Sequence, residues 1–233
     1  MTYKSTPEMA ALEAIFRNSN SVLETLQAFD QIYAQGPMRE NPGGLCHAGA
    51  SNLFLALSQF PTATAVIESG VWRGGSTWII EKALPRLSNL YCLDPNVEDI
   101  GFYRYRSKAA LYSTTDFLDY DWHLPDPAST IVFFDDHQDL LPRLIRCREL
   151  GLKTIILDDN YDSYRDHQTT FTLTPKERLL LGDYSLFVFP RHFTDNPAVE
   201  SVWSASDMVP VWLAPYLCDS ITNYMFFSLL QLG

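Results

Sequence analysis

Basic side chains are scarce in this chain, and acidic ones outnumber them. Seventeen Lys and Arg residues stand against 28 Asp and Glu residues, so the formal net charge at pH 7 is -11. A surface with this balance repels the phosphate backbone of nucleic acids. The densest basic run, RYRSK at 104–108, is short. We therefore expect no nucleic-acid partner.

Long apolar runs are absent as well. No run approaches the roughly 18 apolar residues that a membrane-spanning helix needs. The first residues, MTYKSTPEMAALEAIF, lack the charged and then apolar layout of a secretory signal. These two absences predict a cytoplasmic protein with no membrane partner.

Cysteines are few and widely spaced. Cys46, Cys92, Cys147 and Cys218 form no CxxC pair, so the pattern predicts reduced core residues, and neither a zinc site nor a disulfide framework. The sequence also contains no internal repeat and no low-complexity tract. Its 46% hydrophobic and 19% charged content predicts one soluble domain over residues 1–233.

The domain is predicted to begin with a helical segment, residues 1–60, that precedes a sheet-containing core, residues 61–233. Apolar residues at helical spacing predict a helix over 7–35, and a second helix over 51–60 with Ser51 or Asn52 as its cap. In the core, apolar runs predict strands at 64–70, 89–95, 129–136, 153–160 and 184–190, and helices follow at 76–87 and 139–151. Alternation of this kind indicates an α/β fold with a doubly wound, mostly parallel sheet.

Acidic residues end three of these strands. Asp94 ends the second, and the pairs Asp135–Asp136 and Asp158–Asp159 end the two after it, while Glu68 lies near the end of the first. Ligands of open α/β sheets bind beyond the carboxyl ends of the strands. The acids are therefore predicted to converge on one crevice, with one residue of each pair facing it because neighbouring strand residues point to opposite sides.

The turn ESGVWRGGST, after the first strand, is rich in glycine. Gly70 lets the chain leave the strand sharply, and Gly74 allows a close approach of backbone to a ligand or to the next helix. That helix is expected near Ser76, with its free N–H groups directed at the same place. Asp94 follows Gly70 by 24 residues and can accept hydrogen bonds from ribose hydroxyls. The alternative is a tight strand-to-helix connection without a ligand.

This pattern, Glu68-x-Gly70-x-x-x-Gly74-x-Ser76 followed by Asp94, resembles the cofactor signature of class I S-adenosylmethionine-dependent methyltransferases. The resemblance implies a Rossmann-like methyltransferase fold, with the glycine turn under the methionine part of the cofactor. It places Glu68 near the methionine amino group and Asp94 at the ribose. STTDFLD at 113–119 resembles the segment that contacts adenine, which makes Asp116 and Phe117 candidates; alternatively, Asp116 lies in a solvated turn.

The segments FFDDHQD and LDDNYD share one design, an apolar strand followed by two aspartates. Such carboxylates suit a divalent cation, Mg²⁺, Ca²⁺ or Mn²⁺, which would lower the pKa of a bound hydroxyl. His137 is then a candidate general base. The segments resemble the metal-dependent macrocin O-methyltransferases and the cephalosporin hydroxylases, which implies Asp135, Asp158 and Asp159 as metal ligands. The chain departs from that pattern at DHQD and at Asn160.

Several of these candidate site residues also have a purely structural interpretation. Asp139 is predicted to cap the helix that follows it, and the Asp158–Asp159 pair fits a strand-end turn as well as a metal site. His137 fits a hydrogen-bonded loop histidine, and His47 is a weaker candidate for the crevice. The C-terminal aromatics predict core packing, a substrate wall or a homo-oligomer contact: Trp203, Trp212, Tyr216, Tyr224, Phe226 and Phe227.

The sequence thus predicts an enzyme that transfers a methyl group from S-adenosylmethionine to a hydroxyl of a small polar molecule, assisted by a divalent metal. Two other classes stay open. One is a binding or assembly protein that keeps the fold without turnover. The other is a different enzyme on the same scaffold, either hydroxylase-like or acting on a sugar nucleotide.

Overall fold

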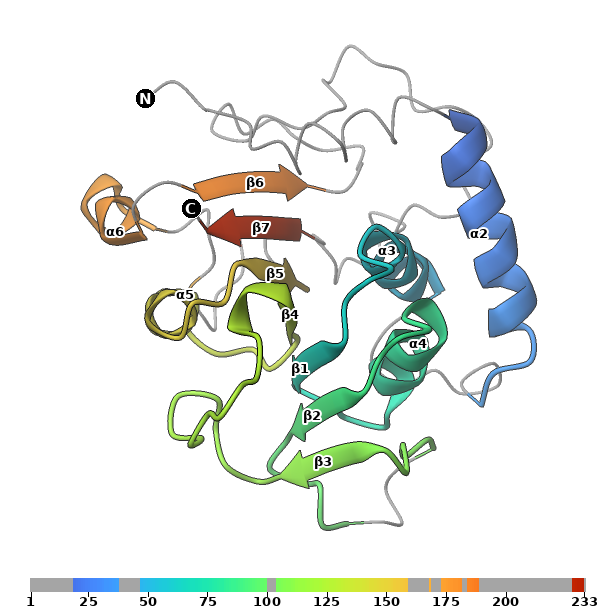
Figure 1. Ribbon diagram of the computed structural model, residues 1–233, viewed down its shortest axis with the longest axis horizontal. Coiled ribbons are helices and arrows are strands. Elements are labelled where there is room, and N and C mark those ends of the chain that lie inside the picture. The colour runs from blue at the N-terminus through green and yellow to red at the C-terminus, as the bar shows by residue number, and fades with distance from the viewer. Residues whose placement is uncertain are drawn as a thin grey trace.

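The computed structural model describes residues 19–37, 47–99, 104–158, 168, 173–181, 184–188 and 228–232. These residues form one seven-stranded sheet with helices on both faces (Figure 1). The strands are β1 Ala65–Ser69, β2 Asn89–Leu93, β3 Ala110–Ser113, β4 Thr130–Phe134, β5 Thr154–Leu157, β6 Tyr184–Val188 and β7 Ser228–Leu232. The helices are α2 Ser19–Tyr33, α3 His47–Ser58, α4 Gly75–Ala83, α5 Leu140–Glu149 and α6 Pro175–Leu181, with a 3₁₀ turn at Pro127–Ser129.

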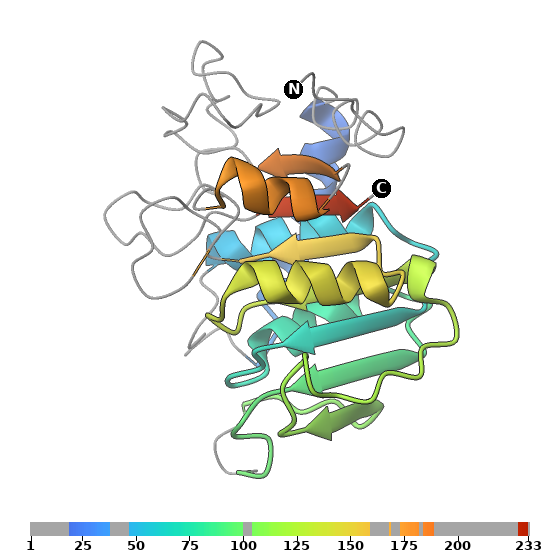
Figure 2. The same ribbon diagram turned by 90° about the vertical axis from the view of Figure 1, so that its left-hand side faces the viewer.

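The strand order is β3-β2-β1-β4-β5-β7-β6. The first five strands are parallel, and β7 runs antiparallel between β5 and β6. Figure 2 shows the parallel strands ending on one side of the sheet while β7 points the other way. The predicted doubly wound, mostly parallel, Rossmann-like sheet is therefore confirmed. Its order reverses between β1 and β4, which is the point where ligands bind in open α/β sheets.

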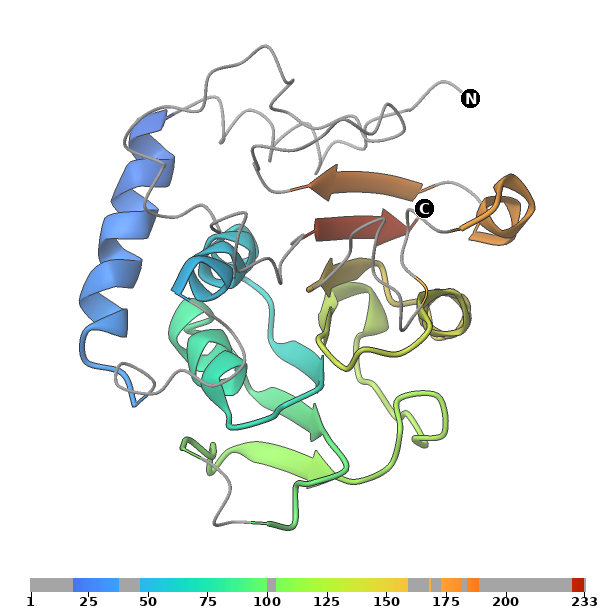
Figure 3. The ribbon, with the colours of Figure 1, turned by 180° about the vertical axis from the view of Figure 1, so that it is seen from behind.

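The two faces of the sheet carry different helices. α2, α3 and α4 cover one face, with α2 outermost (Figure 3), whereas α5 and α6 cover the other (Figure 2). Strand residues alternate between the two cores: Val66 and Phe133 pack in the first, and Ile67 and Phe134 in the second. This alternation decides which helix each strand-end acid meets.

The helix predictions need two corrections. α3 begins at His47, so Ser51 and Asn52 lie inside the helix and cap nothing, and Ser51 is fully buried. Asp139 stands at the N-cap of α5 but makes no capping hydrogen bond; its Oδ1 accepts from the Gln168 backbone N–H (2.9 Å). The strands β3 and β7 and the helix α6 were not predicted.

The cysteine prediction is confirmed where the structure describes it. Cys92 and Cys147 are free thiols buried in the two cores, and burial raises the pKa of each. Within the described residues, no helix has the length and apolar character needed to span a bilayer. The C-terminal aromatics at 203–227 lie outside the described residues.

Candidate functional site

A pocket of about 620 Å³ opens at the carboxyl ends of the parallel strands. Four strands contribute to it: the segments after β1, β2, β3 and β4 form its walls, and Arg143 of α5 closes one side. Its lining consists of Ser69, Gly70, Trp72, Leu93, Asp94, Pro95, Asn96, Thr114, Thr115, Asp116, Asp135, Asp136, His137, Gln138 and Arg143. The predicted convergence of strand-end acids on one crevice is thus observed for Asp94 and the Asp135–Asp136 pair.

The glycine turn after β1 is held tightly against its neighbours. Gly70 has φ +91°, and a Cβ there would lie 2.1 Å from the Asp135 carbonyl oxygen. Gly74 has φ +86°, and a Cβ there would lie 1.9 Å from the carbonyl oxygen of Tyr105. Both positions require glycine for their own backbone contacts. α4 then begins at Gly75, one residue before the predicted start.

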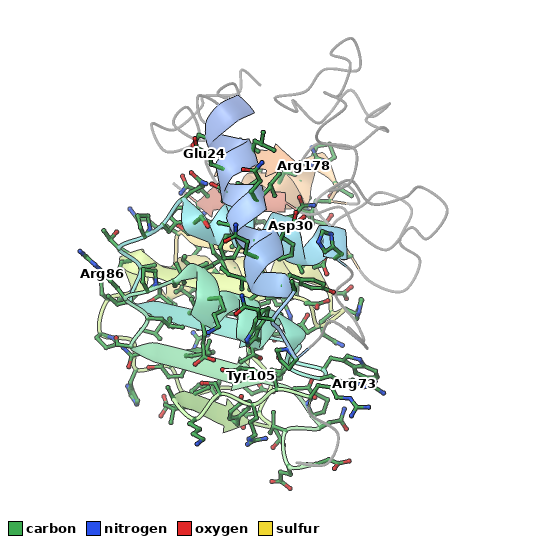
Figure 4. The ribbon with its side chains drawn as sticks, turned by 90° about the vertical axis from the view of Figure 1, so that its right-hand side faces the viewer. Glu24, Asp30, Arg73, Arg86, Tyr105 and Arg178 are labelled. Carbon is green, nitrogen blue, oxygen red and sulfur yellow. The ribbon has the colours of Figure 1, made fainter. Side chains whose placement is uncertain are left out.

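A second segment supports this turn from outside. The backbone N–H groups of Arg104 and Tyr105 donate to the Arg73 carbonyl (3.0 and 3.1 Å), and Figure 4 shows Arg73 and Tyr105 on the same side of the molecule. The Tyr105 hydroxyl donates to Glu81 of α4. Between the glycines, Trp72 has φ +48° and is 47% exposed at the pocket wall. A positive φ at a tryptophan is strained, so the surrounding contacts hold the turn in one shape.

Asp94 fastens the glycine turn to the end of β2. Its Oδ2 accepts from the backbone N–H groups of Val71 (3.1 Å) and Trp72 (2.9 Å), and its Oδ1 accepts from Asn96 N–H (2.7 Å). The residue is 8% exposed and lines the pocket. Each carboxylate oxygen has more than one acceptor direction, so the side chain can order the turn and still accept from a ligand.

Glu68 lies beneath this turn and is not among the residues that line the pocket. It is fully buried, and its Oε2 accepts from Thr77 Oγ1 of α4 (2.7 Å) and Cys92 Sγ of β2 (3.2 Å). Burial raises the pKa of Glu68 to about 7, against the opposing effect of hydrogen bonds from Ser76, Thr77 and Cys92. Its predicted contact with a methionine amino group stays a prediction, and its described contacts are structural.

The segment after β3 places its two candidates differently. Asp116 lines the pocket, and its carboxylate accepts from Arg143 Nη1 (3.2 Å) and Nη2 (2.7 Å). Burial raises the pKa of Asp116, but the hydrogen bonds and the charge of Arg143, together with backbone N–H groups of Leu118 and Phe117, outweigh burial and hold this pKa below its usual value. Phe117 is fully buried and packs edge-on against Phe134 (ring centroids 4.9 Å apart). The prediction that Phe117 contacts adenine is therefore wrong, because the ring belongs to the core.

After β4, the two aspartates take different surroundings. Asp136 lies two residues after Phe134, on the side of the sheet that α5 covers. Its carboxylate accepts hydrogen bonds from Arg143 Nε (3.0 Å) and from Ser69 Oγ (2.5 Å). Asp135 lies 4.0 Å from His137, measured from Oδ1 to Nε2. His137 has φ +53° and a side chain 47% exposed. Both aspartates line the pocket, so the expectation that only one faces the crevice is not met.

The described residues alone do not form the predicted metal site. Among them, no three Asp, Glu, His or Cys side chains gather as ligands of one ion. Asp158 is 9% exposed at the end of β5 and is not part of the pocket lining. Asp159 lies outside the described residues. Asp136, the other acid of the β4 pair, is neutralised by a guanidinium, so we assign no chemistry here to a metal.

Two residues correct or extend the sequence-based picture. His47 does not reach the pocket: its Nε2 lies 3.1 Å from Asp30 Oδ1 of α2, and its ring packs edge-on against Tyr33. Arg143 was missed, since it occupies an ordinary helical position. The available signal was its charge on the apolar face of α5, between Leu140, Leu144 and Cys147, where an unpaired arginine is unfavourable.

No protein-family model matches the chain, and no curated protein matches its sequence. Several solved structures have a similar shape. They include a proposed O-methyltransferase from Klebsiella pneumoniae (11% identity, 91% of this chain and 90% of that chain covered, TM-score 0.48). An S-adenosylmethionine-dependent methyltransferase from Mesorhizobium loti is 14% identical over 77% of this chain and 95% of that one (TM-score 0.44). The plantazolicin methyltransferase BpumL, in complex with SAH, is 12% identical over 96% and 98% (TM-score 0.44).

These identities are low and the TM-scores are below 0.5, so the fold rests on the strand order and register of this chain itself. What the chain binds must likewise be argued from its own pocket.

Proposed function

We propose that this protein is an S-adenosylmethionine-dependent methyltransferase that methylates a hydroxyl oxygen of a small polar molecule. The observation that carries the proposal is the pocket itself. It lies at the reversal point of the sheet and combines a strained glycine turn with Asp94 at the end of β2. Its volume of about 620 Å³ falls within the usual range for cofactor and small-molecule sites.

The charge of the pocket fits this cofactor. Asp94, Asp116, Asp135 and Asp136 line it together with Arg143, which gives the lining a formal charge of -3. S-adenosylmethionine carries a sulfonium and an ammonium group against one carboxylate, so its net charge is +1. A low-dielectric acidic pocket attracts such a molecule and disfavours anionic competitors.

Different residues of the pocket would contact different parts of the cofactor. Asp94 would accept from the ribose hydroxyls, and the backbone at Gly70 would lie along the methionine part. Thr114 and Asp116, after β3, would border the adenine. When bound, the cofactor supplies an electrophilic methyl group.

His137 is the candidate general base for the acceptor hydroxyl. Its imidazole lines the pocket and is about half exposed, so an acceptor can reach it. Asp135, 4.0 Å away, would stabilise the imidazolium that forms when the ring takes the hydroxyl proton. The strained loop that carries His137 fixes the ring near the pocket wall.

The test is calorimetric titration of the folded protein with S-adenosylmethionine and with its demethylated product, SAH. We expect binding that weakens at least tenfold in Asp94→Asn, a variant that keeps one acceptor oxygen for the turn. Asp121→Asn is the matched control, because the Asp121 side chain is 90% exposed and outside the pocket lining. Circular dichroism checks that each variant is folded.

The absence of binding at millimolar ligand to folded wild-type protein would refute the proposal. Turnover is tested separately with labelled methyl groups and a panel of hydroxylated acceptors. On an accepted substrate, His137→Gln should lower kcat while the affinity for SAH stays within about twofold.

A further inference from the structure

Arg143 is a buried cation at the wall of an acidic pocket. Its side chain is 2% exposed although it carries a full charge. It comes from α5, and it reaches the segments after β3 and β4, which are separate in sequence. Buried arginines of this kind persist only where carboxylates neutralise them and satisfy their N–H groups.

The guanidinium contacts two aspartates, and two of its nitrogens meet each of them. Nη1 and Nη2 donate to Oδ1 and Oδ2 of Asp116 (3.2 and 2.7 Å). Nε donates to Oδ2 of Asp136 (3.0 Å), and Nη2 lies 2.8 Å from the same oxygen. Paired contacts fix the plane of the guanidinium and of both carboxylates.

One nitrogen of this group takes the place of a bridging ion. Nη2 lies 2.7 Å from Asp116 Oδ2 and 2.8 Å from Asp136 Oδ2, so both negative oxygens converge on it. A divalent cation that bridged these two carboxylates would need the same space. Ser69 Oγ and the Gln138 backbone N–H occupy further acceptor directions of Asp136 (2.5 and 3.3 Å).

The sequence explains why this residue can reach the pocket. Asp136 continues the alternation of Val132 and Phe134, which face the core under α5. Arg143 lies on the inner side of α5, and its guanidinium carbon is 5.7 Å from the centre of the Phe134 ring. The side chain therefore passes along an apolar surface before it meets the acids.

We infer that Arg143 is the permanent cation of this pocket: it positions Asp116 and Asp136 in place of a divalent metal, and the pocket binds its ligand without one. Ligand binding without a metal rests on the proposed function. The role of Arg143 as the cation does not, because it is tested by the response of the protein alone to metal.

The first arm of the test uses no cofactor. Thermal unfolding is followed in EDTA and in Mn²⁺ for wild type, Arg143→Met and Arg143→Lys. Arg146→Met is the matched control, since Arg146 lies on the same helix in a partly exposed ion pair with Glu149 (3.2 Å). In wild type, Arg143→Lys and the control, we expect Tm in Mn²⁺ to stay within about 1 °C of its value in EDTA.

Arg143→Met leaves two converging carboxylates without their cation. We expect its Tm to fall in EDTA, and to rise by about 3 °C when Mn²⁺ reaches ten times its dissociation constant. A merely structural arginine would not produce this gain of response to metal. If folded Arg143→Met shows no response, or if Mn²⁺ stabilises wild type and Asp136→Asn removes that effect, the inference is overturned.

The wild-type measurement keeps the inference testable even if Arg143→Met does not fold. The second arm titrates wild type and Arg143→Lys with SAH in EDTA and in Mg²⁺. We expect wild-type affinities that agree within twofold and a weaker affinity in Arg143→Lys. Loss of wild-type binding in EDTA with recovery in Mg²⁺ would overturn the inference. Absence of SAH binding in both buffers would refute only the proposed function, and the first arm would still decide the role of Arg143.

Discussion

The ionisation of Glu68 should make the stability of this protein depend on pH in a defined direction. The side chain is fully buried between β1, β2 and α4, and burial raises its pKa from 4.5 to about 7. At 1.36 kcal/mol for each pKa unit, this difference corresponds to about 3 kcal/mol in the free energy of unfolding. That is a large share of the stability of an ordinary domain.

The direction in which the free energy of unfolding changes with pH follows from the number of protons that each state binds. Below about pH 4.5, Glu68 is protonated in both the folded and the unfolded state, so ionisation of this residue does not lower the free energy of unfolding. Between about pH 4.5 and 7, the unfolded chain releases the proton while the folded chain keeps it, so the free energy of unfolding falls as the pH rises. Above about pH 7 both states are ionised, and the loss has reached its full size.

The assay is urea unfolding at pH values from 4.5 to 8, followed by far-ultraviolet circular dichroism. Wild type is compared with Glu68→Gln, which is neutral at every pH and nearly isosteric. We expect wild type to lose about 3 kcal/mol relative to Glu68→Gln over this range. Glu24→Gln is the control, since Glu24 lies exposed on α2 (Figure 4) and should follow wild type.

Parallel curves for wild type and Glu68→Gln would refute the reasoning, because they would mean that the buried carboxyl titrates alike in both states. A wild-type curve that rises with pH relative to the variant would refute it too. That result would require a lowered pKa in the folded state, and hence a stronger set of donors around Glu68 than Ser76, Thr77 and Cys92.

Two substitutions test the backbone and the core of the site. Gly74→Ala should cost more than about 3 kcal/mol in urea unfolding, because it adds a clash with the Tyr105 carbonyl to the strain of a positive φ. Gly151→Ala, with φ +76° and only an ordinary van der Waals contact to the Pro127 Cβ (3.8 Å), should cost only about 1–2 kcal/mol; equal costs would show that the clash adds nothing. Phe117→Ala should cost about 3–5 kcal/mol in the same assay, while its affinity for SAH below the unfolding transition stays near wild type. A specific loss of affinity would return Phe117 to the binding site.

The strands of the sheet were predictable where an apolar run is bounded by turn residues. β1, β2, β4, β5 and β6 lie within the predicted ranges because each is a short apolar or β-branched run between turn residues. β3, with the sequence ALYS, is only half buried at the edge of the sheet and carries no such signal. β7 pairs antiparallel between β5 and β6, and its place depends on contacts far away in sequence.

Asp94, Asp135 and Asp136 were predictable for the same reason, since each follows a strand whose end is visible in the sequence, whereas Asp116 follows β3 and was a candidate only through a family resemblance. The groups that bind these carboxylates could not be predicted from the sequence. Asp94 binds the backbone of the glycine turn, 22 and 23 residues earlier, and Asp136 meets an arginine seven residues later on a helix. Sequence patterns show which residue types reach a strand end, whereas the ion that neutralises them depends on how helices pack over the sheet.

The identity of that counter-ion changes the chemistry to be expected of the pocket. A divalent cation would have drawn ligand oxygens toward Asp135 and Asp136 and acidified a bound hydroxyl. A guanidinium that is shared between Asp116 and Asp136 cannot be displaced at low cost, because its removal leaves two converging carboxylates without their shared cation. Under the proposed function, activation of an acceptor hydroxyl then falls to a proton acceptor at the pocket wall, a role for which we propose His137 beside Asp135.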